Sequence, residues 1–347
     1  GNLKEFEGPQ FLHVITKKGA GLDPAEADRV GFHAIGKIKS IKSESTKLPK
    51  YQDIFGDWIV DMAAADENLV AITPAMREGS GLVKFSKIYP ERYFDVAIAE
   101  QHSVTFAAGL SIKNKKPVVA IYSTFLQRAY DQLIHDVAVQ NLDVTFALDR
   151  SGLVGEDGPT HSGNYDISYL RCIPNMIIMT PSDENETRKL LTTGYLYNGP
   201  AAVRYPRGTG PNTNVEKELS PLEIGKAKVI KDAGSKTVFL NFGALLDEAM
   251  IVSDELNITL IDMRFVKPLD EDLLKEYLST ADMFISLEDG AVMGGAGSSV
   301  QEFCSENSIN IKSKLFGIPD KFIDHASRKE MIEEAGLVSR KILESLK

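Results

Sequence analysis

One stretch, from Phe94 to His102, constrains the fold more than any other part of the chain. Its apolar residues, rich in Val and Ile, predict a buried parallel strand. A helix is predicted directly afterwards, from Gln101 to about Asn114. Glu100 therefore stands at a strand-to-helix junction, where a carboxylate complements the positive end of the helix dipole. That role would be purely structural, and the neighbouring motifs favour a chemical one.

Residues from Tyr51 to about Pro206 alternate short apolar strands with amphipathic helices, which is typical of a parallel α/β sheet covered on both faces. Helices are predicted at 54–66, 101–114, 125–139 and 184–195. Strands are predicted near 69–72, 94–97, 118–122, 144–148, 176–179 and 202–204. Loops at the carboxyl ends of such strands form active sites. Glu100, Tyr122, Arg150 and Arg207 each follow a predicted strand, so we expect them to converge on one crevice.

A second α/β unit is predicted after a linker at 208–221, where Gly, Pro, Thr and Asn cluster. Its strands are expected near 237–241, 259–262, 283–287 and 311–316, and its helices near 244–256, 270–279, 298–307 and 328–335. The predicted fold class is thus α/β, with two consecutive parallel-sheet domains. Their expected bounds are 50–207 and 222–347.

Composition narrows the classes of function. The 39 basic and 49 acidic residues give a net charge of −10, which argues against non-specific nucleic-acid binding. No apolar run approaches the roughly 18 residues of a membrane span, and no basic-then-apolar leader begins the sequence. We expect the two cysteines, Cys172 and Cys304, to be reduced and buried, which suits a cytoplasm or a plastid stroma.

Several further motifs occur in a fixed order along the chain. They are Ile72 to Gly81 (ITPAMREGSG), Ile121 to Gln132 (IYSTFLQRAYDQ), Asp149-Arg150, Gly155 to Gly163 (GEDGPTHSG) and Arg204 to Gly208 (RYPRG). Together with the Glu100 stretch, this set closely resembles the 1-deoxy-D-xylulose 5-phosphate synthases, a family of thiamine-diphosphate enzymes in the transketolase superfamily. The resemblance runs along the whole chain but covers only the C-terminal part of that family.

The resemblance implies where thiamine diphosphate binds. Glu100 matches the glutamate that hydrogen-bonds the pyrimidine ring, a role that needs a carboxyl group shielded from water. Phe125 matches the aromatic residue that stacks on the aminopyrimidine, and Ile98 and Met76 match apolar contacts to the cofactor. Without the resemblance, these three would be interpreted as ordinary core residues.

The resemblance also implies the substrates, pyruvate and D-glyceraldehyde 3-phosphate, and the products, 1-deoxy-D-xylulose 5-phosphate and carbon dioxide. Arg150 and Arg207 are the candidates for binding the phosphate, because guanidinium groups make bidentate bonds to phosphate oxygens. Tyr122 and Arg128 match further contacts to the sugar phosphate. Asp157 and His161 match a polar pair that orients the aldehyde, with His161 also a catalytic candidate. For Arg204 we expect a surface salt bridge.

Residues 1–49 are interpreted as the remnant of a first domain and a linker. Pro9–Thr16 predicts a strand, which would need partners from elsewhere because a lone strand is marginal. In the resemblance, Lys18 contributes to the cofactor site and His33 is a proton-handling catalytic group. Without the motif match, His33 would be interpreted as a hydrogen-bonded loop residue.

The metal-binding half of the family's active site is absent from this sequence. The family holds the cofactor diphosphate through Mg²⁺ with a Gly-Asp-Gly motif and a later Asn in its first domain, and the nearest match here, Gly56-Asp57, lacks the second glycine. Mg²⁺ requires oxygen ligands in near-octahedral geometry. We therefore expect no metal ligand in this chain, and activity only together with a first domain from the same protein or another chain. The family also implies a homodimer.

Two other functions stay open at this point. The chain could be part of a two-chain transketolase or the beta subunit of a 2-oxoacid dehydrogenase, since both share the glutamate and the architecture. It could also be a non-catalytic interaction fragment that keeps only the fold. A separate motif, Gly294 to Gly297, could bind a phosphate at a helix start. A turn that allows close helix packing is favoured there, because the spacing of a phosphate-binding loop is absent.

Overall fold

The computed structural model describes residues 2–32 and 48–347. The chain divides into two compact units, 1–47 and 48–347. Within the first unit, the described residues form a short 3₁₀ helix, η1 (Asn2–Glu5), and a short helix, α1 (Asp23–Ala27). The strand predicted for Pro9–Thr16 is wrong: the segment is irregular, and Phe11 and Ile15 are 89% and 85% exposed. Among residues 2–32 it finds no second strand with which to form a sheet.

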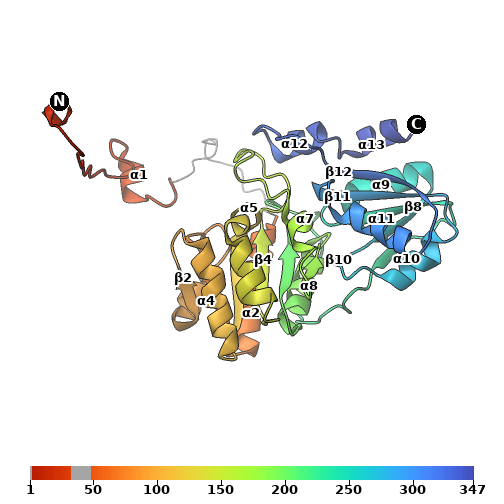
Figure 1. The fold of residues 1–347 in the computed structure, drawn as a ribbon, viewed down its shortest axis with the longest axis horizontal. Coiled ribbons are helices and arrows are strands. Elements are labelled where there is room, and N and C mark those ends of the chain that lie inside the picture. Colours follow the sequence, from red (N-terminus) through yellow and green to blue (C-terminus); the bar gives the residue numbers. More distant parts are fainter. Residues whose placement is uncertain (1, 33–47) are drawn as a thin grey trace. The chain divides into compact units, whose positions relative to one another are not determined.

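The second unit contains a seven-stranded sheet in the order β10-β5-β6-β4-β3-β1-β2. Figure 1 labels β2, β4 and β10 of this sheet. Every pair of neighbours is parallel except β10 and β5. The strands are β1 (Leu69–Thr73), β2 (Tyr93–Asp95), β3 (Lys116–Tyr122), β4 (Thr145–Asp149), β5 (Ile177–Met179), β6 (Ala201–Arg204) and β10 (Phe265–Lys267). The helices are α2 (Tyr51–Ala65), α3 (Val83–Ile88), η2 (Pro90–Arg92), α4 (Glu100–Ile112), α7 (Asp166–Leu170) and α8 (Glu184–Leu196).

Both faces of this sheet are covered by apolar side chains, as the continuous apolar strands predict. On one face α2 packs against α8, where the Trp58 indole donates a hydrogen bond to Thr192 Oγ1 at 3.0 Å. The side chains of Trp58, Phe55 and Tyr205 are fully buried there. Each such burial contributes roughly 1.5–3 kcal/mol. This core fixes the strands whose carboxyl ends carry the candidate site.

A five-stranded sheet follows, in the order β12-β11-β8-β9-β7, with only β7 and β9 antiparallel. Its strands are β7 (Lys228–Lys231), β8 (Thr237–Phe242), β9 (Thr259–Asp262), β11 (Met283–Ala291) and β12 (Lys312–Ile318). Its helices are α9 (Leu246–Leu256), α10 (Glu271–Leu278), α11 (Ala296–Glu306), α12 (Arg328–Glu334) and α13 (Ser339–Leu346). The two consecutive sheets, each dominated by parallel pairs, confirm the predicted fold class.

The long helix predicted for 125–139 is not continuous. The structure has α5 (Ser123–Leu126), the 3₁₀ turn η3 (Gln127–Ala129), α6 (Tyr130–Gln132) and a π-helical segment, η4 (Leu133–Ala138). The amide of Val139 donates to the carbonyl of Ile134, five residues earlier, at 2.9 Å. Short π-helical insertions of this kind often occur near functional sites. Here Phe125 lies on α5 and Arg128 on η3, and the π-helical segment follows a few residues later.

The cysteine prediction is correct for one residue. Both thiols are free, and Cys304 is buried on α11, but Cys172 is exposed. Cys172 lies just beyond the end of α7, where its thiol contacts the carbonyl of Tyr169 at 3.3 Å. The next residue, Ile173, takes the buried position instead and is 3% exposed. No described helix is long and apolar enough to cross a bilayer.

Candidate active site

Four neighbouring parallel strands, β2, β1, β3 and β4, end at the same edge of the seven-stranded sheet. Three residues just beyond these ends have left-handed backbones: Ala75 (φ 61°), Ala97 (φ 56°) and Arg150 (φ 59°). Such a conformation costs a non-glycine residue of the order of 1 kcal/mol and persists where surrounding contacts enforce it. The chain thus turns sharply at three of the four strand ends, and these turns carry the residues that the sequence singled out.

Asp95 holds two of these turns together. Its Oδ1 atom accepts hydrogen bonds from the amides of Ala75 and Ala97, each at 3.0 Å. The first amide directly precedes Met76, and the second directly precedes Ile98. Sequence reasoning missed Asp95, although a carboxylate at the last position of a strand was a usable signal.

Glu100 is the first residue of α4 and is only 3% exposed. Its carboxylate accepts hydrogen bonds from Arg128 Nη1, at 3.1 Å to Oε2 and 3.3 Å to Oε1. The Arg128 side chain is 55% exposed, so solvent screens this pair and it contributes little to stability. A carboxylate at this helix start is favoured by the dipole, and its burial makes it suited to share a hydrogen bond with a bound ring.

A row of stacked side chains runs along the same edge. The guanidinium carbon of Arg150 lies 4.2 Å from the centroid of the Tyr122 ring. The Tyr122 ring in turn stacks on Phe125 at 5.6 Å with an interplanar angle of 16°, and Phe125 meets His161 edge-on at 5.4 Å. Tyr122 is the last residue of β3, Phe125 lies on α5, and His161 belongs to the loop after β4. The structure therefore brings four of the sequence-predicted site residues together.

Arg150 is buried and held by several partners. Its Nη1 atom donates to the carbonyl of Gly79 at 2.6 Å and to Gln52 Oε1 at 3.2 Å, and it pairs with Asp149. Burial raises the pKa of the Asp149 carboxyl to about 6, and the Arg150 charge opposes that rise. Burial likewise raises the pKa of the Tyr122 hydroxyl. Gln52 and Gly79 were not found from the sequence, since neither has a distinctive spacing.

Arg207 lies beside the loop that bears Asp157. Its Nη1 atom pairs with Asp157 and Glu156, each at 3.1 Å, and donates to the carbonyl of Val154 at 2.7 Å. The Arg207 side chain is 34% exposed. At the other end of this loop, His161 Nδ1 contacts Thr160 Oγ1 at 2.9 Å, which leaves Nε2 available for a substrate. Asp157 and His161 thus lie on the loop after β4, and Arg207 contacts this loop from the segment after β6.

Met76 and Ile98 directly follow the left-handed residues Ala75 and Ala97 at the strand ends. Met76 is 8% exposed and belongs to the core, whereas Ile98 is 76% exposed. Lys18 lies in the first unit, and His33 lies outside the described residues. Across residues 2–32 and 48–347, no group of three or more His, Cys, Asp or Glu side chains could hold a metal ion.

The surface salt bridge expected for Arg204 is wrong. Arg204 is 3% exposed, and it pairs with two buried carboxylates, Asp166 at 2.9 Å and Asp289. Asp289 belongs to β11 of the second sheet, so the Arg204–Asp289 pair forms where the two sheets pack together. The position of Arg204 at a strand end could not reveal this contact.

The glycine-rich turn before α11 is a packing feature, as the sequence favoured. The amides of Ala296 and Gly297 donate to the Glu288 carboxylate, both at 2.9 Å. A side chain at position 297 would lie 2.3 Å from Ser286 Oγ. The helix start is therefore already occupied by a carboxylate from the chain itself. Burial raises the pKa of Glu288 to about 7.

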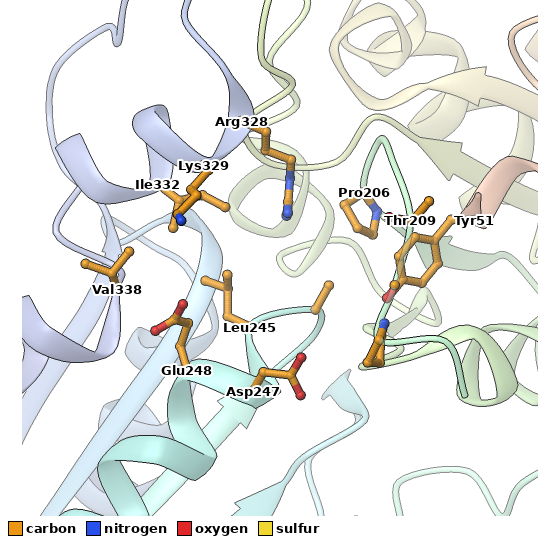
Figure 2. A pocket seen from close by; sticks show the side chains of 13 residues that line it. Tyr51, Pro206, Thr209, Leu245, Asp247, Glu248, Arg328, Lys329, Ile332 and Val338 are labelled. Atoms are coloured by element: carbon orange, nitrogen blue, oxygen red, sulfur yellow. The ribbon is translucent and has the colours of Figure 1, made fainter. Parts of the chain in front are cut away.

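A cavity of about 300 Å³ is lined by a different set of residues, among them Arg328, which lies 3.9 Å from Asp289. Figure 2 shows the Arg328 side chain extending into it, with Tyr51 and Pro206 on one side and Leu245 and Asp247 on another. None of the sequence-predicted site residues lines it. The strand-end cluster therefore remains the candidate active site, because it has the convergent charged and aromatic groups.

Two family models match the chain: "Transketolase, pyrimidine binding domain" over residues 47–212 and "Transketolase, C-terminal domain" over residues 225–342. The chain belongs to the transketolase family. The first match contains the ends of β1, β2, β3 and β4, which carry the candidate site. The candidate site therefore lies at one edge of the sheet in the segment that matches the pyrimidine-binding domain.

Among curated transketolase-family relatives, the 1-deoxy-D-xylulose-5-phosphate synthase of Pseudomonas putida (strain KT2440) is 59% identical over 350 residues, covering 100% of this chain and 55% of the relative. The protein of the same name from Pseudomonas aeruginosa (strain LESB58) is 60% identical over 338 residues, covering 97% and 54%. The chain therefore spans about half the length of the curated relatives it matches, and it corresponds to their C-terminal portion.

Solved transketolase structures share the fold. A structure described as "Split gene transketolase, inactive beta4 tetramer" has a TM-score of 0.76 and 25% identity, covering 85% of this chain and 96% of that one. The transketolase of Campylobacter jejuni has a TM-score of 0.69 and 17% identity, covering 89% and 48%. The second likeness shows the fold alone.

Proposed function

We propose that this chain is the pyrimidine-binding and C-terminal part of a thiamine-diphosphate-dependent transferase. The enzyme condenses pyruvate with D-glyceraldehyde 3-phosphate to give 1-deoxy-D-xylulose 5-phosphate and carbon dioxide. The single observation that carries the choice of reaction is the 59% identity, over the whole chain, to proteins named for that product. The reaction requires a first domain, which we place in another part of the same protein or in a separate chain.

The residues present fit the cofactor. Glu100 offers a buried carboxylate whose side-chain partner, Arg128, is 55% exposed, so that water screens the pair. We assign Glu100 to the pyrimidine ring, Phe125 to stacking on that ring, and Ile98 and Met76 to apolar contacts. When bound, thiamine diphosphate supplies the carbanion chemistry that removes carbon dioxide from a 2-oxoacid. We place the ligands of Mg²⁺ in the first domain.

We assign the acceptor to the arginines near this sheet edge and to the loop that bears Asp157 and His161. Arg150 and Arg207 supply two guanidinium groups for the phosphate, and each can form charge-assisted bonds to its oxygens. Tyr122 and Arg128 add contacts to the sugar phosphate. An aldehyde lying against Phe125 would meet His161 Nε2, and Asp157 would orient the acceptor hydroxyl. His161 is then placed to hold a proton at the aldehyde oxygen as the new carbon–carbon bond forms.

A second candidate is a two-chain transketolase, in which this chain would work with a separate first-domain chain. The observation that favours it is the likeness to the split-gene transketolase, which this chain covers over 96% of that chain's length. The two reactions differ in the donor, because a transketolase takes a two-carbon unit from a ketose phosphate without releasing carbon dioxide.

The donor therefore provides the test. The part of the Pseudomonas putida relative that this chain does not match would be fused in front of this chain, giving what we call the fused enzyme. It would be supplied either with pyruvate and D-glyceraldehyde 3-phosphate or with D-xylulose 5-phosphate and D-ribose 5-phosphate, in both cases with thiamine diphosphate and Mg²⁺. We expect product from pyruvate only. Turnover of the ketose alone would favour transketolase, and no turnover with either donor would favour a non-catalytic interaction fragment.

A further inference from the structure

A buried chain of charges joins the two sheets behind the candidate site. Asp166 on α7 is 0% exposed, Arg204 at the end of β6 is 3% exposed, and Asp289 on β11 is 4% exposed. Arg204 Nε lies 2.9 Å from Asp166 Oδ2, and Arg204 Nη1 pairs with Asp289. These two carboxylates neutralise the Arg204 guanidinium within the chain.

The Asp166 carboxylate also holds two serine hydroxyls. Its Oδ2 atom accepts hydrogen bonds from Ser123 Oγ at 2.9 Å and from Ser151 Oγ at 3.0 Å, in addition to the bond from Arg204. Both serines are at most 1% exposed. One oxygen atom therefore ties the ends of β3 and β4 to each other and, through Arg204, to Asp289 of the second sheet.

These serines directly follow the residues that stack at the site. Ser123 comes after Tyr122, and Ser151 comes after Arg150, whose backbone has a left-handed φ of 59°. The base of the loop that carries His161 closes on the same point. A side chain at Gly163 would lie 2.4 Å from the carbonyl oxygen of Arg150 and 2.5 Å from Ser123 Cβ, so glycine allows the close approach.

We propose that Asp166 and Arg204 are positioning residues for the acceptor phosphate, acting through Ser123 and Ser151 to fix Tyr122 and Arg150 in their stacked arrangement. The inference rests on the proposed function, and it adds residues that touch neither substrate nor cofactor. It also gives the second sheet a part in acceptor binding, because Asp289 holds the far side of Arg204.

The test uses the double variant Ser123→Ala/Ser151→Ala in the fused enzyme, since alanine removes both hydroxyls without unpairing the buried charges. We expect the KM for D-glyceraldehyde 3-phosphate to rise about tenfold because a small misplacement of binding groups is costly. The KM for pyruvate should change by less than about twofold, because the double variant disturbs only the groups that we assign to the acceptor. Arg204→Lys, which keeps the charge but not the planar fork, should act in the same direction.

Ser253→Ala is the matched control, because Ser253 on α9 is also buried and donates to the carbonyl of Ile258, just before β9, at 2.6 Å. It should lower thermal stability without a change in either KM. Equal losses for pyruvate and the aldehyde in the double variant, or an unchanged KM for the aldehyde, would overturn the inference.

A crystal structure of the double variant gives a readout that does not depend on activity. We expect the Arg150 guanidinium to leave the Tyr122 ring, from which its carbon now lies 4.2 Å. If the stack is unchanged, the inference is wrong whether or not the fused enzyme turns over. An inactive wild-type fused enzyme, in contrast, would contradict the proposed function itself.

Discussion

The guanidinium carbon of Arg150 lies 4.2 Å from the centroid of the Tyr122 ring, at the ends of two neighbouring parallel strands. The contact keeps a buried positive charge at the sheet edge while Gly79 and Gln52 accept hydrogen bonds from one of its nitrogens. An arginine held by a ring face and fixed acceptors is oriented before a ligand arrives. Such preorganisation lowers the cost of binding a phosphate.

Replacing Arg150 by lysine in the fused enzyme should weaken acceptor binding. Lysine keeps the charge but loses the planar fork and the stacking on Tyr122, so we expect the KM for D-glyceraldehyde 3-phosphate to rise by about 10- to 100-fold. Steady-state kinetics with unphosphorylated glyceraldehyde should show a much smaller change. A similar loss with both aldehydes would remove Arg150 from the phosphate site. Arg171→Lys, which alters an ion pair with Glu302 away from the strand ends, serves as the control.

Replacing Glu100 by glutamine should abolish turnover while the fold survives. The change removes only a screened pair with Arg128, worth at most about 1 kcal/mol. The loss of a proton-sharing carboxylate is expected to lower kcat by about 10²–10⁴-fold. Turnover and thermal denaturation would be measured on the same samples, with Glu302→Gln as a surface control. Near-normal kcat would show that Glu100 has no catalytic part.

Replacing Asp95 by alanine should weaken cofactor binding. Ala75 and Ala97 are exposed. Alanine at position 95 removes the shared acceptor of their amides, which costs about 0.5–1.5 kcal/mol for each hydrogen bond. The two left-handed turns that carry Met76 and Ile98 would then relax, so the concentration of thiamine diphosphate needed for half-maximal activity should rise. Asp95→Asn keeps an acceptor oxygen and should restore most of the affinity. If alanine and asparagine behave alike, the hydrogen bonds do not position these turns.

Glu288 should make stability depend on pH. Burial raises its folded-state pKa from 4.5 to about 7, so the folded protein binds the proton more tightly than the unfolded chain does. The stabilisation is complete below about pH 4.5 and is lost as the pH rises through about 7, amounting to at most about 3 kcal/mol. Urea unfolding at pH 5 and pH 8 should therefore show a smaller fall for Glu288→Gln than for the wild type. An equal fall in both proteins would contradict a buried, proton-binding Glu288.

Most of the fold could be predicted because the parallel strands are continuous apolar runs, such as the one that ends at Tyr122. The strands that were missed, β7 and β10, are short and join their sheets in antiparallel edge positions. They lack the long Val- and Ile-rich pattern of a strand buried on both faces. The break after Phe125 was also invisible, since a π-helical segment changes the hydrogen bonding without a distinctive residue type.

The candidate site was predictable in its residue types and only partly in its contacts. Strand-end position and the family resemblance brought forward Tyr122, Arg150 and His161, which the structure places in one row. The supporting groups were not predictable, because Arg204 meets Asp289 85 positions further along the chain. A charged residue at a strand end is ordinarily exposed, and only the packing of the second sheet reverses that expectation.

The most direct measurement follows the fate of pyruvate carbon. The fused enzyme would be incubated with pyruvate labelled with ¹³C at its keto carbon, D-glyceraldehyde 3-phosphate, thiamine diphosphate and Mg²⁺, and the products read by NMR. The account predicts that the label appears at the ketone carbon of 1-deoxy-D-xylulose 5-phosphate, with one carbon dioxide released for each product molecule. Label that remains in pyruvate, under conditions in which the intact Pseudomonas putida relative consumes it, would contradict the account.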